Sequence, residues 1–394
     1  MPSRLETRAG ASFARRLAAF YSTLCMALGV QMPFLPVWFA AKEFDAASVG
    51  LALAIPLIVR PLAIPVATRI ADSYAAARAV IIIGAVATFV GYAAVGLMQS
   101  PLAIMAAVAL ASLFYAPLMP LADAYALRGL GLHGRTYGPV RLWGSAAFIA
   151  GSLGGGLLLD VIAPRELIWI VVGALALNAT ASCTLAPLDE KTLPVPTHRK
   201  TASALLRDSQ FWLLAMAAAF IQASHAIYYG FSALQWRSAG LDGTAIGGLW
   251  ALGVLAEIAM FAASPRLPLD PRAWLVAGAT GAVVRWGAMA FDPAPGVLLL
   301  LLQCLHALSF GATHLGAIGF VARVAPEGQG ASAQGYLAVT LSLATAAAMA
   351  ISGELYARWG GRAYAAMALL ALAGGLFILL WSAVQGANRY RALK

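Results

Sequence analysis

Six ionisable side chains lie inside long apolar stretches of this 394-residue sequence, where they could carry chemistry. They are Arg60, His225, Glu257, Arg285, His306 and His314. An ionised side chain at the centre of a bilayer costs at least about 2.5–3.5 kcal/mol, so such residues usually pair or serve function. A carboxyl kept from water holds its proton more firmly, an imidazole titrates near neutral pH, and a guanidinium binds carboxylates through a two-pronged fork. The set therefore predicts a site that binds a proton and an anion.

Helical spacing places further polar residues on the same faces as the histidines. One face holds Gln222, His225 and Tyr229, and another holds Gln303, His306, Phe310 and His314. Residues spaced three, seven and eleven apart share one side of a helix, which suits the wall of a cavity. We assign proton coupling to Glu257, His225, His306 and His314, and substrate binding to Arg60, Arg285, Gln222, Tyr229, Gln303 and Phe310. For the two glutamines the alternative is hydrogen bonding between helices. A metal site is disfavoured because the histidines lack ligand spacing.

The elements that position these residues follow from composition. The chain is 61% hydrophobic and 11% charged, with a mean hydropathy of +0.81, whereas a soluble domain is about a quarter charged. A helix of about 20 apolar residues crosses a bilayer, so we expect an all-α membrane protein with twelve transmembrane helices. The expected spans lie near 14–41, 48–71, 79–98, 101–127, 140–161, 167–187, 210–237, 244–265, 273–291, 296–323, 334–357 and 363–385.

Basic residues set the expected orientation. With the N-terminus in the cytoplasm, 19 of the 26 Lys and Arg residues fall in cytoplasmic segments and five on the other side, as the positive-inside rule requires. We therefore expect a multi-pass protein of a bacterial inner membrane with both termini cytoplasmic. The net charge of +10 then reflects topology and contact with the lipid bilayer, and it requires no nucleic-acid partner.

The longest polar stretch, residues 189–208, is expected to be a cytoplasmic linker between two six-helix bundles. The bundles are residues 1–188 and residues 209–394. A shift of 197 residues aligns the halves and places Asp45 on Asp242. Together with the matching order of spans, this predicts two parallel repeats.

The same shift places Arg60 on Glu257, so opposite charges occupy matching positions in the second helix of each half. We hypothesise that Glu257 accepts the coupled proton and that Arg60 helps to hold an anionic group of the substrate. The alternative is a fixed ion pair between Glu257 and Arg285.

Several motifs carry a family resemblance. They are 222–231 (QASHAIYYGF), 249–258 (LWALGVLAEI), 285–286 (RW), 305–314 (LHALSFGATH), 123–124 (DA) and 137–145 (YGPVRLWGS). With them the chain resembles the phenylpropionate permease family of the major facilitator superfamily over nearly its whole length. The resemblance implies a substrate site near the midplane between the halves and alternating access. It also implies uptake of an aromatic carboxylate by proton symport, and we expect a monomer without a cofactor.

The loop after the second helix departs from the superfamily pattern. There the pattern usually reads Gly-x-x-x-Asp-Arg-x-Gly-Arg-Arg, whereas residues 68–78 read TRIADSYAAAR, so Asp72 remains but the glycines do not. In the superfamily this loop gates the cytoplasmic side. We assign gating to Asp72, together with Asp123 and Arg141 of the matching motifs.

Other function classes remain as alternatives. A neutral sugar or nucleoside symporter would use Arg60 to bind hydroxyls. A drug exporter working by proton antiport would need an acidic cavity, and two intramembrane Arg residues against one Glu disfavour it. A membrane-embedded enzyme is disfavoured because the sequence has no phosphate-binding loop, nucleophile elbow or zinc motif. A receptor would need larger loops.

Overall fold

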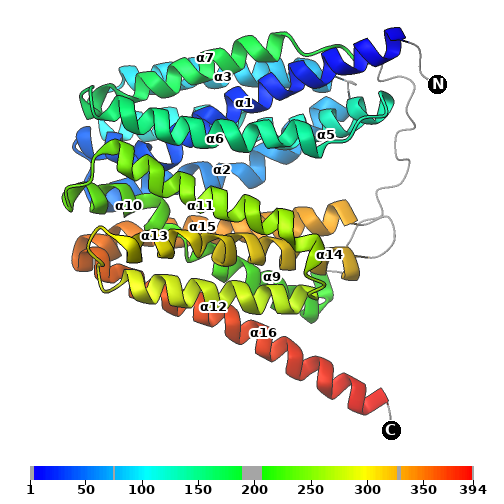
Figure 1. Cartoon of the computed structure of the whole chain (residues 1–394), viewed down its shortest axis with the longest axis vertical. Coiled ribbons are helices and arrows are strands. Elements are labelled where there is room, and N and C mark those ends of the chain that lie inside the picture. Colours follow the sequence, from blue (N-terminus) through cyan, green and yellow to red (C-terminus); the bar gives the residue numbers. More distant parts are fainter. Residues whose placement is uncertain (1–3, 74–75, 189–205, 326–329, 393–394) are drawn as a thin grey trace. The chain divides into compact units, whose positions relative to one another are not determined.

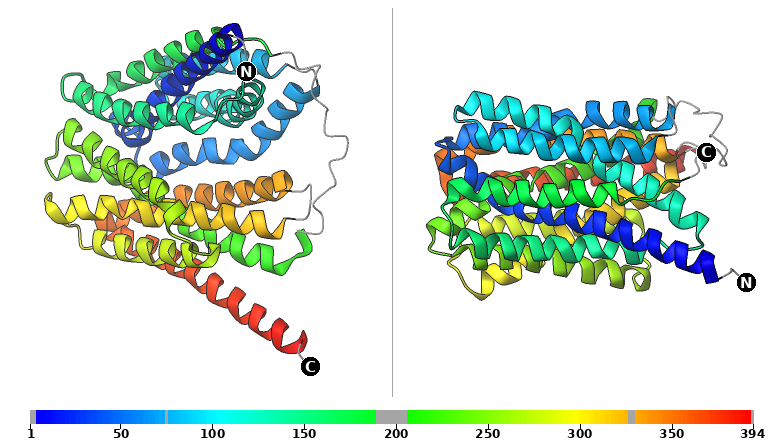
Figure 2. Two further views of the ribbon diagram at one scale, coloured as in Figure 1. Left: turned by 45° about the vertical axis from the view of Figure 1, so that its right-hand side comes forward. Right: turned by 90° about the horizontal axis from the view of Figure 1, so that it is seen from above.

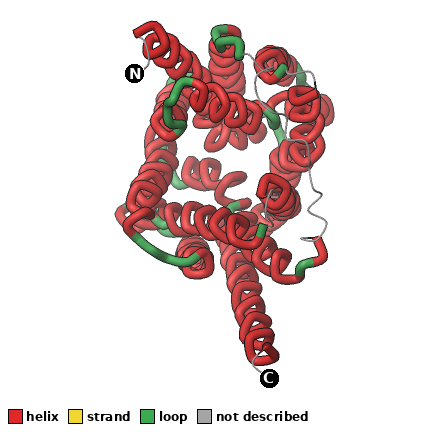
Figure 3. The backbone as a smooth tube through the Cα atoms, turned by 90° about the vertical axis from the view of Figure 1, so that its right-hand side faces the viewer, coloured by secondary structure: helices red, strands yellow, loops and turns green. Residues whose placement is uncertain are grey.

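The computed structural model describes residues 4–73, 76–188, 206–325 and 330–392. Every regular element in these ranges is a helix (Figure 3). A helix satisfies its own backbone hydrogen bonds, which a chain in hydrocarbon requires. Ten helical stretches of the described chain are long and apolar enough to cross a membrane. The protein is thus an all-helical, multi-pass membrane protein.

These ten stretches differ from the twelve expected spans in two places. One stretch, Ser332–Val384, covers both α15 (Gly330–Trp359) and α16 (Tyr364–Ala392). The helix α12 (Pro271–Met289) is not among the ten. It carries two arginines and many Gly and Ala residues, which lower its hydropathy.

The chain forms two compact units (Figures 1 and 2). Unit 1 comprises the residues up to Leu193 together with Gly240–Ala251, and unit 2 comprises Pro194–Ala239 and the residues from Leu252 onward. The helices up to the first unit boundary are α1 (Arg4–Ala41), α2 (Ala46–Ser73), α3 (Ala77–Leu97), α4 (Pro101–Tyr115), α5 (Leu118–Leu132), α6 (Gly138–Leu159), the short η1 (Pro164–Glu166) and α7 (Leu167–Cys183). The later elements are α9 (Ser209–Ala223), α10 (Ala226–Ser238), α11 (Gly243–Ala263), η3 (Ser264–Arg266), α12, α13 (Val297–Cys304), η4 (Ala307–Ala312), α14 (Thr313–Val324), α15, η5 (Gly360–Ala363) and α16.

In unit 1, α1 packs along α6 and α7, and α3 packs against α4 and α7 (Figure 1). Glycines let the backbones of α1 and α6 approach closely. A Cβ atom on Gly29 would lie 2.2 Å from the Phe148 carbonyl oxygen, and one on Gly151 would lie 2.3 Å from that of Met26. The hydroxyl of Ser152 donates to the Gly29 carbonyl at 3.0 Å. Such contacts between small residues are the usual means of tight helix packing in membranes.

Replacing Gly151 with alanine is expected to destabilise the protein by about 1–3 kcal/mol, because the obstructing oxygen belongs to the backbone and cannot rotate away. Gly154 is a matched control on the same helix, since nothing lies within 4 Å of a Cβ added there. Gly154→Ala should leave Tm unchanged or raise it, as alanine is the better helix former. Thermal unfolding in detergent measures both variants, and equal Tm values would contradict the close contact.

In unit 2, α16 packs against α9 and α12, α9 packs against α15, and α12 packs against α14 and η4 (Figure 2). The side chains that form the site described below come from α9, α10, α11, α12 and the α13–α14 segment.

Three spans that were expected as single helices each contain an interruption. The expected span 101–127 breaks between α4 and α5 at Ala116 and Pro117, where proline lacks a backbone donor. The span 210–237 breaks between α9 and α10, next to His225. The span 296–323 contains η4, a π-helical turn that is wider than an α-helical turn.

Equivalent N-terminal helix caps explain why the shift of 197 residues places Asp45 on Asp242. The Asp45 carboxylate accepts a hydrogen bond from the Ser48 amide at 2.8 Å, before α2 begins. Asp242 accepts from the Ala245 amide at 2.7 Å, before α11 begins. Hydrogen bonds from the Ser48 side chain and amide lower the pKa of Asp45. The two aspartates therefore perform the same capping role in their helices.

Most of the expected linker 189–208 lies outside the described residues. Asp208 is described, and its carboxylate caps α9 by accepting from the Gln210 amide at 2.8 Å.

Candidate functional site

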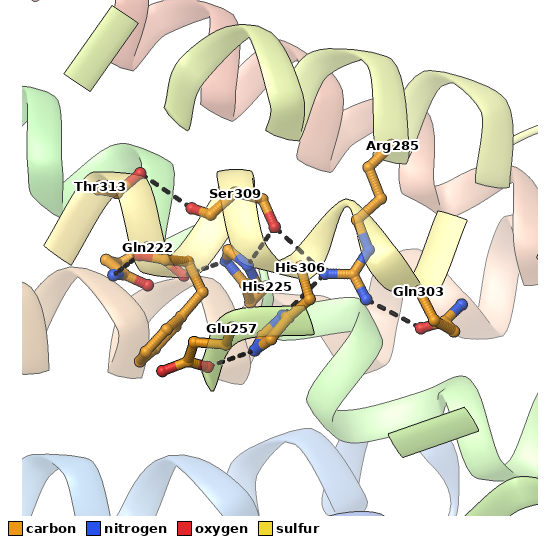
Figure 4. Close-up of polar contacts among 9 residues, drawn as sticks. Gln222, His225, Glu257, Arg285, Gln303, His306, Ser309 and Thr313 are labelled. Atoms are coloured by element: carbon orange, nitrogen blue, oxygen red, sulfur yellow. Dashed lines mark hydrogen bonds and ion pairs between the residues drawn. The ribbon is translucent and has the colours of Figure 1, made fainter. Parts of the chain in front are cut away.

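Arg285 of α12 is the centre of a buried polar cluster in unit 2 (Figure 4). Its Nη1 lies 2.9 Å from His306 Nδ1 and donates to Ser309 Oγ at 3.2 Å. Its Nη2 donates to Gln303 Oε1 at 2.9 Å. Its guanidinium also lies against the rings of Tyr228 and Trp286, 4.5 and 4.4 Å from their centroids. The charge is thus held by polar and aromatic groups within the protein.

The bond from Arg285 determines the tautomer of His306. A guanidinium can only donate, so His306 Nδ1 must accept, and the hydrogen of the neutral ring sits on Nε2. That Nε2 atom lies 3.5 Å from Glu257 Oε2. His306 therefore separates Arg285 from Glu257, and the described residues contain no direct ion pair between those two side chains.

His225 takes the opposite tautomer. Its Nδ1 lies 3.1 Å from the Gln222 carbonyl oxygen, which can only accept, so Nδ1 carries the hydrogen. Its Nε2 then accepts from the Ser309 hydroxyl at 3.1 Å. His225 is fully buried and both ring nitrogens are bonded. A neutral ring satisfies both bonds, and His225 anchors the break between α9 and α10.

The π-helical turn η4 brings Ser309 into the cluster. Ser309 accepts from Arg285 and donates to His225, so it joins α12 to α9–α10. The Thr313 hydroxyl donates to the Ser309 carbonyl at 2.9 Å, and Gln222 Nε2 donates to the Phe310 carbonyl at 3.4 Å (Figure 4). Such turns are frequent at functional sites.

Ser309→Ala is expected to destabilise the protein by about 1–3 kcal/mol, because His225 Nε2 would lose its donor while remaining buried. The exposed Ser238 is a suitable control, since its hydroxyl only bonds back to the Leu234 carbonyl within α10. Ser238→Ala should change Tm little. Thermal unfolding measures both, and an unchanged Tm for Ser309→Ala would remove Ser309 from the network.

The structure gathers some of the residues predicted for the site and leaves others apart. Gln222, His225, Arg285, Gln303 and His306 are buried in the cluster, while Glu257 is partly exposed at its edge.

The remaining predicted residues lie around or away from this cluster. Tyr229 stacks on His225 with ring centroids 5.5 Å apart. Phe310 stacks between His306 and His314, at 5.2 and 6.3 Å. His314 also lies near the Phe261 ring, with centroids 6.1 Å apart, and the residue is exposed. Arg60 lies in α2 of unit 1, and its side chain is exposed.

Four contributing residues were not predicted as site residues. Ser309 and Tyr228 contact Arg285, Trp286 lies beside it, and the Ser224 hydroxyl accepts from Trp286 Nε1 at 2.8 Å. A usable signal for Ser309 was its position one helical turn after His306.

A second polar cluster lies in unit 1 around Asp123 of α5. The hydroxyls of Tyr21 and Tyr137 both donate to Asp123 Oδ1, at 2.6 and 2.7 Å. The Arg141 guanidinium lies 5.3 Å from the Tyr21 ring centroid and donates to Cys25 Sγ at 3.6 Å. Burial and the hydrogen bond to Asp123 raise the pKa of Tyr137 to about 12. The phenol therefore stays protonated and continues to donate throughout the physiological pH range.

The third residue predicted to gate, Asp72, is an exposed residue in the last turn of α2. Among the described residues, no group of three or more His, Cys, Asp or Glu side chains is arranged to hold a metal ion. In this cluster Glu257 is the group that could take up and release a proton, and His306 Nε2 is placed to donate a hydrogen bond to its ionised form.

Comparison with known proteins identifies the family of this chain. Residues 14–366 match the model of the MFS_1-like family. The chain belongs to the MFS_1-like family. This transporter is therefore a member of the major facilitator superfamily and is not an enzyme, and the superfamily resemblance seen in the motifs is confirmed.

Two curated relatives align with nearly the whole transporter. It is 32% identical over 374 residues to the "Probable 3-phenylpropionic acid transporter" of Escherichia coli (strain K12), covering 91% of this chain and 95% of the relative. It is 26% identical over 366 residues to the "Maltose permease" of Geobacillus stearothermophilus, covering 92% of each chain.

Solved structures share the fold. A crystal structure of the nucleoside transporter NupG, a point mutant, matches with a TM-score of 0.82 and 18% identity. The match covers 94% of this chain and 99% of the other. The transporter therefore has the major facilitator fold.

Proposed function

We propose that this transporter imports a small aromatic carboxylate together with a proton, by alternating access. The relative named as a probable 3-phenylpropionic acid transporter, at 32% identity over 91% of the chain, supports this substrate class. The proposed setting is a bacterial inner membrane, with both termini cytoplasmic. The proposed topology has twelve spans in two parallel repeats, counting α12 and taking α15 and α16 separately.

The observation that carries the proton role is the chain of contacts from Arg285 through His306 to Glu257. Glu257 is the one carboxyl in contact with this cluster among the described residues, and it is partly exposed. A carboxyl at such an edge can take a proton from water and give it up again. His306, whose Nε2 hydrogen points to Glu257, can stabilise the ionised form.

The proposed ligand for the substrate carboxylate is Arg60. Its side chain is exposed, and no described residue forms a hydrogen bond or ion pair with it. Arg285 is already bonded to three side chains and fully buried. We therefore assign Arg285 to positioning His306, and Arg60 to binding the anion.

Ligand-induced thermal stabilisation tests the substrate class. Purified transporter is heated with 3-phenylpropionate, maltose, a nucleoside or a cationic drug, at about pH 5.5 and about pH 7.5, because a ligand that binds the native state raises Tm. The proposal expects stabilisation by 3-phenylpropionate, greater at the lower pH and lost in Arg60→Ala.

A neutral-sugar symporter is the second candidate, and the maltose permease relative favours it. Stabilisation by maltose and not by 3-phenylpropionate would replace the first proposal with this one. Stabilisation only by the cationic drug would overturn both.

A further inference from the structure

A basic pocket lies in unit 1 where three candidate membrane spans meet. Its volume is about 640 Å³, and it is lined by Arg15, Arg16, Ala19, Arg78, Cys183, Thr184, Leu185 and Pro187. These residues belong to α1, the first turn of α3 and the end of α7 with the residues that follow. The ends of spanning helices lie at the depth of the lipid headgroups. The pocket is therefore at the height of the interface.

Two of its arginines are fixed by the end of α7. Arg16 Nη1 donates to the Thr184 carbonyl at 3.1 Å. Arg78 Nε donates to the Leu185 carbonyl at 2.7 Å, and its Nη2 donates to that of Cys183 at 3.4 Å. The last carbonyls of a helix need such partners. Because these bonds already hold the two guanidinium groups in place, a ligand that binds them reduces the side-chain entropy of the arginines only a little further.

The third arginine, Arg15, is not held by the end of α7. Arg15 is exposed, and no described residue forms a hydrogen bond or ion pair with it. None of the described residues lining the pocket is acidic. Three guanidinium groups thus share one concave site without a counter-charge among its described lining residues, which favours a bound anion.

The equivalent position in unit 2 has different chemistry. A shift of 197 residues carries Arg15, Arg16 and Ala19 onto Trp212, Leu213 and Met216. Those three residues line a pocket of about 500 Å³ beside α16, together with Arg207, Ser209, Phe377 and Val384. A pocket at this end of the helices is thus a feature of both repeats. The described lining of the second pocket holds one arginine, Arg207, where that of the first holds three, so the cluster is not a consequence of the architecture.

We propose that the unit 1 pocket binds the phosphate of an anionic phospholipid. A phosphodiester offers oxygens that match guanidinium forks, and the acyl chains of a lipid seated at this depth would extend along the exposed apolar sides of α3 and α7. Basic pockets between spanning helices at an interface are the usual form of such sites. Because arginine stays charged, binding does not depend on pH near neutrality, and salt weakens it.

Native mass spectrometry of the whole protein tests this. The protein in a neutral detergent is titrated with phosphatidylglycerol, with phosphatidylcholine of the same acyl chains, and with inorganic phosphate. We expect phosphatidylglycerol to bind more tightly than the other two. Arg15→Gln should weaken its binding about five-fold, and Arg15→Lys should retain most of it. Arg16 and Arg78 stay unchanged, because their bonds support the end of α7.

The control is Arg323→Gln, which removes an exposed charge from the last turn of α14, away from the pocket lining. It should leave binding unchanged. Equal binding of the two lipids, or equal effects of Arg15→Gln and Arg323→Gln, would overturn the proposal. Equal or tighter binding of inorganic phosphate would also overturn it, by assigning the pocket to a free anion.

Discussion

Arg285→Ala is expected to be the most destabilising single substitution in unit 2, by about 3 kcal/mol or more. The change would leave the buried acceptors on His306 and Gln303 without a donor, at about 1–3 kcal/mol each, and would open a cavity beside Tyr228 and Trp286. Uptake should also fall to background, because His306 would lose the bond that orients its ring. Thermal unfolding, with a fall in Tm of roughly 10 °C, and uptake into proteoliposomes measure the two effects.

Two further variants distinguish the effect of the Arg285 hydrogen bonds on stability from the effect of a positive charge. Arg285→Lys keeps the charge, but one ammonium cannot replace a planar fork bonded to three side chains, so it should recover only part of the lost stability. Arg237→Ala removes an exposed arginine from the end of α10 and should change Tm little. If all three variants unfold at the wild-type temperature, Arg285 does not hold the cluster together.

Glu257→Gln is expected to abolish proton-driven accumulation while leaving the fold intact. For one proton carried with one anion, each unit of pH difference can drive about ten-fold accumulation in the wild type. Glutamine cannot take the proton, so the ratio should fall to about one at any pH gradient. The side-chain oxygen can still accept from His306 Nε2, so Tm should remain near that of the wild type.

Proteoliposomes with an imposed pH gradient and labelled 3-phenylpropionate measure this accumulation. Empty liposomes run alongside, since a weak acid also crosses lipid unaided. Exchange of labelled for unlabelled substrate at equal pH should persist in Glu257→Gln, because no net proton movement is needed. Glu354→Gln alters an exposed carboxylate paired with Arg358 and serves as the charge-matched control. Normal accumulation by Glu257→Gln would remove Glu257 from the proton pathway.

Much of the fold could be predicted from the sequence, because the hydrocarbon of a bilayer leaves few ways to satisfy backbone hydrogen bonds. Long apolar runs must form helices there, and their polar ends mark the boundaries. The interruptions were harder to foresee. Pro117 signals a break through its missing donor, but the turns at His225 and at Ala307–Ala312 have no proline within them. They are stabilised by contacts between helices, such as the bond from His225 to Ser309, which helical periodicity within one segment does not contain.

The same reasoning applies to the site. The rarity of charge in apolar runs identified Arg285, His306 and Glu257, and helical spacing added Gln222 and Gln303. Spacing from His306 points to Ser309, three residues later, but it does not distinguish Ser309 from its neighbour Phe310, and the π-helical turn decides between them. Nor could it predict that His306 lies between Arg285 and Glu257, since that order depends on how α11, α12 and η4 pack.

The sequence shift of 197 residues pairs two interrupted helices, and their interruptions differ in kind. The break after α4 contains Pro117, whose ring prevents an uninterrupted helix whatever its neighbours do. The turn in η4 instead holds one surplus residue without any covalent obstacle. A shift of one residue would convert this turn into regular α-helix and rotate α14 about its own axis by about 100°. Of these two interruptions, only the turn in η4 would allow such a rotation, and Ser309, which contacts Arg285, lies within it.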